Sequence, residues 1–116
     1  MKSVMTGGPF LVAVAAALSL TTPSRAVAQD AAKGEGVYNA QKCSVCHAIA
    51  GKGNKANPLD GVGAKLSADD IRAWIVEPVQ MATKTNSSKK PPMPKKWAAL
   101  PAAELDGLVA YMQSLK

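Results

Sequence analysis

The sequence has few of the residues that bind structural metals or build large aromatic cores. Its 116 residues include one His, two Cys, two Trp, two Tyr and one Phe. A structural zinc site needs about four ligands, mostly Cys and His, so these three Cys and His residues cannot complete one. The longest apolar run, residues 10–20, is shorter than the roughly 20 residues that span a bilayer. We therefore expect one small domain without a membrane anchor.

Acidic side chains are also scarce, with 8 Asp and Glu against 14 Lys and Arg and a net charge of +6. Several of the lysines fall within residues 84–96. This stretch lacks the interleaved aromatic residues and the recognised module of a nucleic-acid-binding domain. Nucleic acid is therefore not an expected partner, and the positive charge favours proteins with acidic surfaces.

Both Cys residues and the only His lie within residues 43–47, which have the sequence Cys-Ser-Val-Cys-His. Residues three apart on a helical turn share a face, so both thiols can reach one edge of a ligand. The residue after the second Cys can then place its imidazole beneath an iron. Covalent attachment of a c-type haem uses two such thiols and an axial imidazole. We interpret the motif as a haem attachment site.

Three other interpretations of the Cys pair are possible. A thioredoxin-like redox pair lies beside a strand-helix-strand pattern, which the sequence does not contain. Half of a zinc site would need further Cys or His ligands, and the chain has none. A disulfide across two intervening residues would close a strained loop of little stabilising value.

The motif resembles the haem-binding motif of monohaem cytochromes c, and weaker matches extend the resemblance over most of the chain after residue 30. The resemblance implies an all-α, cytochrome c-like fold of three to four helices around one covalently bound haem c with its iron. It implies that Cys43 and Cys46 attach the haem and that His47 is an axial ligand. It also implies that the N- and C-terminal helices cross.

Residues 1–28 have the features of a cleaved signal peptide. Lys2 gives the N-terminal region a positive charge, and residues 10–20 form the apolar run. Residues 26–28, Ala-Val-Ala, have the small-x-small form of a signal peptidase site. We expect cleavage after Ala28, which leaves a cytochrome c domain of residues 29–116. In bacteria the resemblance implies haem attachment outside the cytoplasmic membrane, so the periplasm is the expected location.

The remaining chain contains three helical patterns separated by two loops. We expect a helix over residues 30–42, because Asp30 can cap it and good helix formers follow. We also expect helices from Ser67 to Glu77 and from Leu100 to the C-terminus, because their apolar residues recur at helical spacing. Pro78 should end the second helix. Glycine, Asn and Pro mark residues 48–63 as a loop, and residues 79–97 are polar, basic and without regular periodicity.

The resemblance also implies several contacts. It places Gly34 and Tyr38 where the terminal helices cross, with Tyr111 packed on Gly34 and Leu108 on Tyr38. A proline carbonyl after the motif binds the His N–H in the family, and Pro58 is the candidate here.

Two further aromatic and thioether side chains have candidate roles. Trp74 is expected in the core, and the resemblance implies that its indole N–H could also bind a haem propionate, since a buried indole N–H generally needs a partner. Met93 resembles the second axial ligand of the family because of its Met-Pro sequence and the two prolines before it. Met81 is the alternative ligand, and Met112 lies on an apolar helical face and is expected in the core. Either loop Met could instead simply fill a gap in the core.

These features predict an electron-transfer protein rather than an enzyme. With His47 and Met93 both bound, the iron would have no position left for oxygen or a substrate, and the thioether would raise its reduction potential. Lysines around Met93 would attract redox partners with acidic docking surfaces. The alternatives are a haem-based gas sensor with a labile Met ligand, or a dedicated electron-transfer subunit of one oxidoreductase complex.

Overall fold

A computed structural model of the chain describes residues 7–9 and 25–116. The predicted signal peptide therefore lies outside the described residues except at 7–9 and 25–28. The helical elements are α1 (Arg25–Ala40), η1 (Cys43–Val45), α2 (Val62–Lys65), α3 (Ala68–Val76), α4 (Pro78–Lys84), η2 (Lys95–Ala99) and α5 (Ala102–Ser114), where η denotes a 3-10 helix. Two-residue strands β1 (Ala48–Ile49) and β2 (Lys52–Gly53) form an antiparallel pair. The all-α prediction is confirmed.

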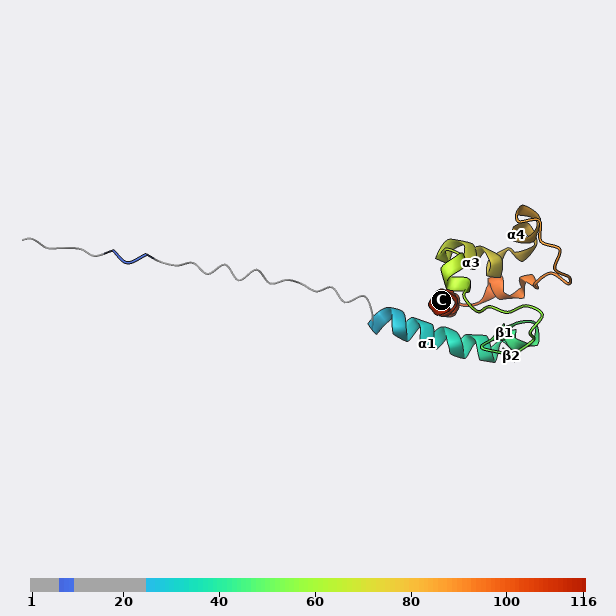
Figure 1. Cartoon of the computed structure of the whole chain (residues 1–116), viewed down its shortest axis with the longest axis horizontal. Coiled ribbons are helices and arrows are strands. Elements are labelled where there is room, and N and C mark those ends of the chain that lie inside the picture. The colour runs from blue at the N-terminus through green and yellow to red at the C-terminus, as the bar shows by residue number, and fades with distance from the viewer. Residues whose placement is uncertain (1–6, 10–24) are drawn as a thin grey trace, which may run out of the picture.

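Helices α1 and α5 make the most extensive contact in the described fold, and α3 packs on the other side of α5 (Figure 1). The crossing is close because Gly34 faces Gly107. A Cβ at Gly34 would collide with the carbonyl of Gly107 and lie 2.7 Å from Cβ of Tyr111. The rings of Tyr38 and Tyr111 meet edge to face, with centroids 5.8 Å apart. The predicted crossing of the terminal helices is confirmed, with Gly107 as an additional participant.

Helix α1 differs from the prediction at both ends. It begins at Arg25 rather than at Asp30 and ends at Ala40 rather than at Lys42. Alanines at 26 and 28 are strong helix formers and continue the helix upstream. At the other end Lys42 adopts the left-handed conformation with φ 55°, which stops the helix and turns the chain into η1.

The segment after α3 is more regular than the sequence predicts. Ser67 caps α3 by accepting a hydrogen bond from the N–H of Asp70 at 3.1 Å, as its position before an acidic first turn suggests. Pro78 ends that helix but is also the first residue of α4, a position that suits its missing N–H. Pro78 and Met81 are both buried and hold α4 in place. The prediction of an irregular segment over 79–97 is therefore wrong for α4 and η2.

The core lies where α1, α3, η2 and α5 meet. Met112 belongs to it, as predicted, but Trp74 is only half-buried and Trp97 takes the core position. Its buried members are Val37, Tyr38, Ile71, Ile75, Trp97, Leu105, Leu108, Val109 and Met112.

Among the described residues, every helix is too short or too polar to span a membrane.

Gly34 and Gly36 provide a matched test of the helix crossing. Gly34→Ala should lower the free energy of unfolding by about 1–3 kcal/mol or more, because a methyl group has no space against α5. Gly36 lies on the exposed face of α1 with open space around it. Gly36→Ala should therefore raise that free energy by about 0.5–1 kcal/mol. Urea denaturation followed by circular dichroism measures both, and an equal effect of the two substitutions would contradict the close crossing.

Candidate functional site

The Cys-Ser-Val-Cys-His motif forms a tight turn directly after α1. The N–H groups of Cys46 and His47 both donate to the carbonyl of Cys43, at 3.1 and 2.9 Å. In a 3-10 turn, residues three apart lie in line, which suits two thiols that must reach one ligand edge. Both thiols are free. Cys43 is half-buried against the core, whereas Cys46 is exposed.

The imidazole of His47 is oriented by a backbone carbonyl. Nδ1 lies 3.1 Å from the carbonyl oxygen of Asn57. A carbonyl can only accept, so Nδ1 carries the proton and Nε2 keeps its lone pair. Burial lowers the pKa of His47 from its usual value, although the bond to Asn57 acts in the opposite direction. The ring is therefore neutral at pH 7, as a metal ligand must be.

The acceptor is Asn57 and not Pro58, which corrects the prediction. The N–H of Ala48 donates to the carbonyl of Asn57 at 3.2 Å, and the N–H of Leu59 donates to the carbonyl of Ala48 at 2.8 Å. Residues 57 and 59 thus both face the chain at 47–48. Because successive carbonyls of an extended chain point in opposite directions, the carbonyl of Pro58 faces away from His47.

Two asparagines tie the same loop to the motif. The side-chain amide of Asn54 donates to the carbonyl of Val45 at 3.2 Å, and that of Asn57 donates to the carbonyl of Cys46 at 3.1 Å. The N–H of Asn54 lies 2.9 Å from the carbonyl of His47. Sequence reasoning missed both residues, and their only sequence signal was a loop rich in Asn and Gly. Together these bonds fix the backbone of the motif.

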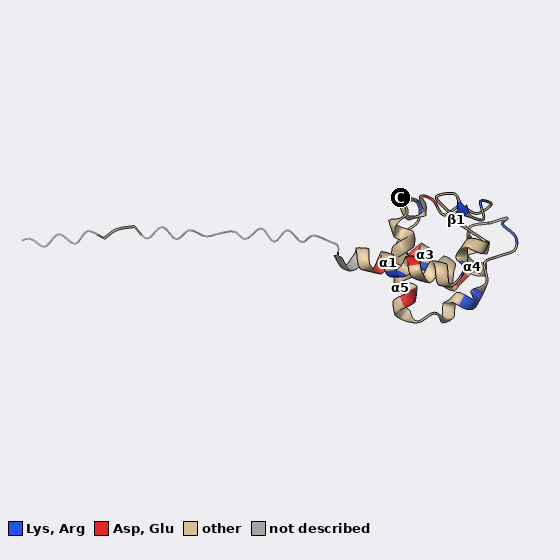
Figure 2. Ribbon diagram, turned by 90° about the horizontal axis from the view of Figure 1, so that it is seen from below, with Lys and Arg blue, Asp and Glu red and all other residues tan. Residues whose placement is uncertain are grey.

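The segment that carries Met93 is anchored on both sides of the motif. The Lys89 ammonium donates to the carbonyl of Ala56 at 3.1 Å, next to Asn57. The Trp97 indole N–H donates to Oε1 of Gln41 at 3.2 Å, two residues before Cys43. Met93 lies between these anchors, half-buried against the core. The views in Figures 1 and 2 place the loop before η2 at the same end of the molecule as β1.

Met81 lies elsewhere. It is buried on α4 and lines a groove between α3 and α4 together with Asp69, Arg72, Ala73, Val76, Glu77, Gln80 and Lys84. No residue of the motif lines this groove.

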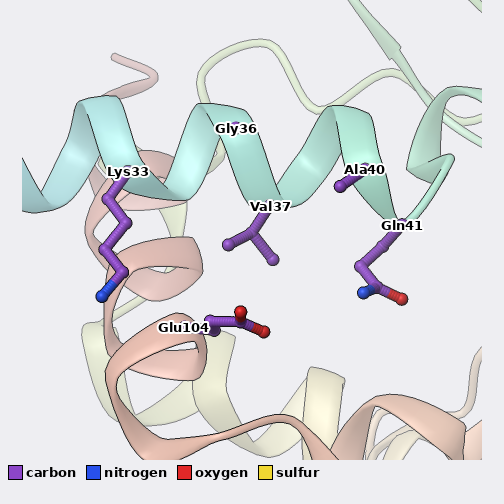
Figure 3. Close-up of a pocket in the computed structure, with 6 residues that line it drawn as sticks. All are labelled: Lys33, Gly36, Val37, Ala40, Gln41 and Glu104. Atoms are coloured by element: carbon purple, nitrogen blue, oxygen red, sulfur yellow. The ribbon is translucent and has the colours of Figure 1, made fainter.

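A second groove runs between α1 and the start of α5 (Figure 3). Figure 3 shows Val37 and Ala40 on α1 above Glu104, with Lys33 and Gln41 at the two ends. The motif does not contribute to it either. The candidate site is therefore defined by the motif turn and the anchored segment rather than by these open grooves.

Burial affects the half-buried thiol of Cys43 and the buried hydroxyl of Tyr38. Burial raises the pKa of the Cys43 thiol, although a backbone hydrogen bond and Lys96 act against this shift. Burial also raises the pKa of Tyr38, and the charges of Cys43, Tyr111 and Asp60 add to the effect. Within residues 25–116, the buried Tyr38 hydroxyl makes no hydrogen bond to another protein group.

A protein-family model for cytochrome c matches residues 31–116, well over half of the chain. None of the curated proteins and none of the solved structures compared with the chain matches it. The family carries a covalently bound haem c with its iron, as the resemblance in the sequence implied.

The residues of the motif fit this cofactor. Two free thiols lie on one turn, and a neutral imidazole with its Nδ1 already bonded leaves Nε2 for a metal. Within the described ranges, no group of three or more Cys, His, Asp and Glu could hold a metal ion unaided. A porphyrin that brings its own four nitrogen ligands suits such a donor set.

The unpartnered Tyr38 hydroxyl generates a stability prediction. Tyr38→Phe should raise the free energy of unfolding by about 1 kcal/mol, because a buried hydroxyl without a partner has lost its hydration without compensation. Tyr111→Phe is the control, since Tyr111 is only half-buried, and it should have a smaller effect. Denaturant titration of the purified holoprotein measures both. A clear loss of stability in Tyr38→Phe would show that the hydroxyl has a partner there.

Proposed function

Because the chain belongs to the cytochrome c family, it is a haem-based electron-transfer protein, and we propose that it is a periplasmic carrier of single electrons. In this proposal Cys43 and Cys46 would hold the haem through thioether bonds, and His47 and Met93 would bind its iron. The haem supplies the one-electron change between Fe(II) and Fe(III). The protein supplies the ligands, the apolar surroundings and the docking surface.

The orientation of His47 supports its role as the first axial ligand. Its Nδ1 proton is directed to Asn57 at 3.1 Å, which fixes both the tautomer and the plane of the ring. A hydrogen bond at the outer nitrogen also makes the inner nitrogen more basic. The asparagine bonds to Val45 and Cys46 keep the backbone on which this ring is mounted in place.

The double anchoring of the Met93 segment is the observation that carries the ligand assignment. Lys89 binds beside the acceptor of His47, and Trp97 binds beside the entry to the motif. Met93 lies between these two attachments, whereas Met81 is buried on α4. Met93 is therefore the better candidate for the sixth ligand.

Two strong axial ligands would restrict the chemistry of the iron. If His47 and Met93 both bind the iron, neither oxygen nor a substrate could bind it, and the haem would supply electron transfer alone. A thioether ligand favours Fe(II), as does an apolar haem pocket, so the potential is expected to be high. This is why we propose a carrier and not an enzyme.

Positive and apolar groups near the motif suggest how a redox partner docks. Figure 2 shows lysines along the loop before η2 and on η2 itself, and Lys89, Lys90, Lys95 and Lys96 are exposed. Val45, between the two cysteines, is 68% exposed. An apolar contact close to the haem with lysines nearby suits a partner with an acidic docking surface.

The periplasmic location is supported by the sequence of the N-terminal segment. Lys2, the apolar run and the Ala-Val-Ala site have the order of a signal peptide. The family match begins at Ala31, shortly after the expected cleavage point.

Substitution of the two methionines tests the ligand set. Visible spectra of the oxidised, reduced and carbon monoxide-treated holoprotein should show a low-spin iron that does not bind carbon monoxide. Met93→Ala should lower the potential by on the order of 0.1 V, within the roughly 0.8 V over which axial ligands act, and should allow carbon monoxide to bind. Met81→Ala is the matched control and should keep the wild-type spectrum while losing about 2–5 kcal/mol of stability.

Prompt binding of carbon monoxide to the wild-type protein would contradict the carrier proposal and favour a sensor. If carbon monoxide bound to Met81→Ala rather than to Met93→Ala, the assignment of Met93 as an iron ligand would be wrong. The proposal of electron transfer would remain valid.

The docking surface is tested with a small anionic oxidant. Lys90→Glu combined with Lys95→Glu should slow oxidation of the reduced protein by ferricyanide about tenfold or more at low salt, because local positive charge attracts anions. At about 1 M salt the Debye length is about 3 Å and the difference should vanish. Lys33→Glu with Lys65→Glu makes the same change in net charge on α1 and α2. An equal effect of the two pairs would mean that net charge, not this surface, controls the rate.

A further inference from the structure

The expected cleavage point after Ala28 lies in the first turn of α1, before the helix meets α5. Ala28, Gln29 and Asp30 are exposed on α1. The carbonyl of Asp30 already lies against α5, because a Cβ at Gly107 would be 3.2 Å from it. Cleavage after Ala28 would therefore leave this contact intact and make Gln29 the first residue.

We propose that Gln29 becomes the N-terminal residue and is then converted to pyroglutamate, an inference that rests on the export step of the proposed function. The amine nitrogen of Gln29 would attack the carbonyl carbon of its own side-chain amide. A new C–N bond closes a five-membered lactam, and the former amide nitrogen leaves as ammonia with the proton lost from the amine. The reaction is balanced without an oxidant or a cofactor.

The surroundings of Gln29 permit this reaction. Its side chain is exposed, so it can fold back onto the amine without disturbing the core. The side-chain carbon chain has the length that gives a five-membered ring. Asn in the same place would have to form a four-membered ring, which is strongly strained.

The charge at the start of α1 gives the modification a physical consequence. A free N-terminal amine has a pKa of about 7.7–8.0 and is mostly protonated at pH 7. Such an ammonium would lie at the positive end of the α1 dipole. It would also lie one turn from Lys33, on the same helical face. Lactam formation removes this positive charge and blocks the terminus.

Intact mass spectrometry of the holoprotein isolated from the periplasm tests the proposal. We expect the mass of residues 29–116 plus one haem, less one ammonia, and no N-terminal sequence by Edman degradation until pyroglutamyl aminopeptidase is added. Gln29→Asn should be cleaved at the same site and keep a free amine. Its isoelectric point should be higher than that of the wild-type protein, because it keeps one more positive charge.

The possible failures are distinguishable. A chain that begins at Gln29 and keeps its ammonia after prolonged incubation would overturn the modification but leave export unaffected. A chain that begins at another residue would overturn both the modification and the cleavage site. An uncleaved chain recovered only from the cytoplasm would overturn the modification together with the export step.

Discussion

The contact between Gly34 and Gly107 determines how the rest of the domain is arranged. Two helix backbones approach without side chains between them, and a methyl group at Gly34 would not fit. This closeness sets where α1 lies on α5 and therefore where the motif turn begins. Tyr38 and Tyr111 fill the angle beside the crossing, and α3 and Trp97 close the core around α5.

Around that crossing, the site is held largely by side chains that hydrogen-bond to backbone carbonyls. The Asn57 carbonyl orients His47, and the amides of Asn54 and Asn57 hold the carbonyls of the motif. The Met93 segment is attached to the same region through Lys89 and Trp97. These side chains pair with backbone carbonyls of the motif and its loop, as backbone groups outside regular structure require. Substitutions in the loops therefore matter chiefly when they change these bonds.

The sequence predicted the chemistry of the motif well because that chemistry is local: two thiols and an imidazole within five residues specify their own geometry. The helical faces of α3 and α5 were also predictable from their periodicity. Contacts between residues far apart in the sequence were not predictable in this way. Trp74 lies on an apolar stripe with Ile71 and Ile75, whereas Trp97 follows Lys95 and Lys96, and only the tertiary packing puts Trp97 in the core. Whether the carbonyl of Asn57 or that of Pro58 faces His47 depends on a strand-like pairing of this loop with Ala48. No local sequence pattern predicts that pairing. The sequence did not predict helix α4, because a proline can either end one helix or be the first residue of the next.

The glycine crossing has a consequence for the order of folding. Its two partners belong to the first and last helices, so most of the domain lies in the loop that their contact closes. Such a contact is entropically costly and forms only after the intervening chain is available. Synthesis proceeds from the N-terminus, so α1 has no surface to pack on until α5 has been made. During that interval Cys43 and Cys46 belong to an open chain, and their thiols are accessible before any core can cover Cys43.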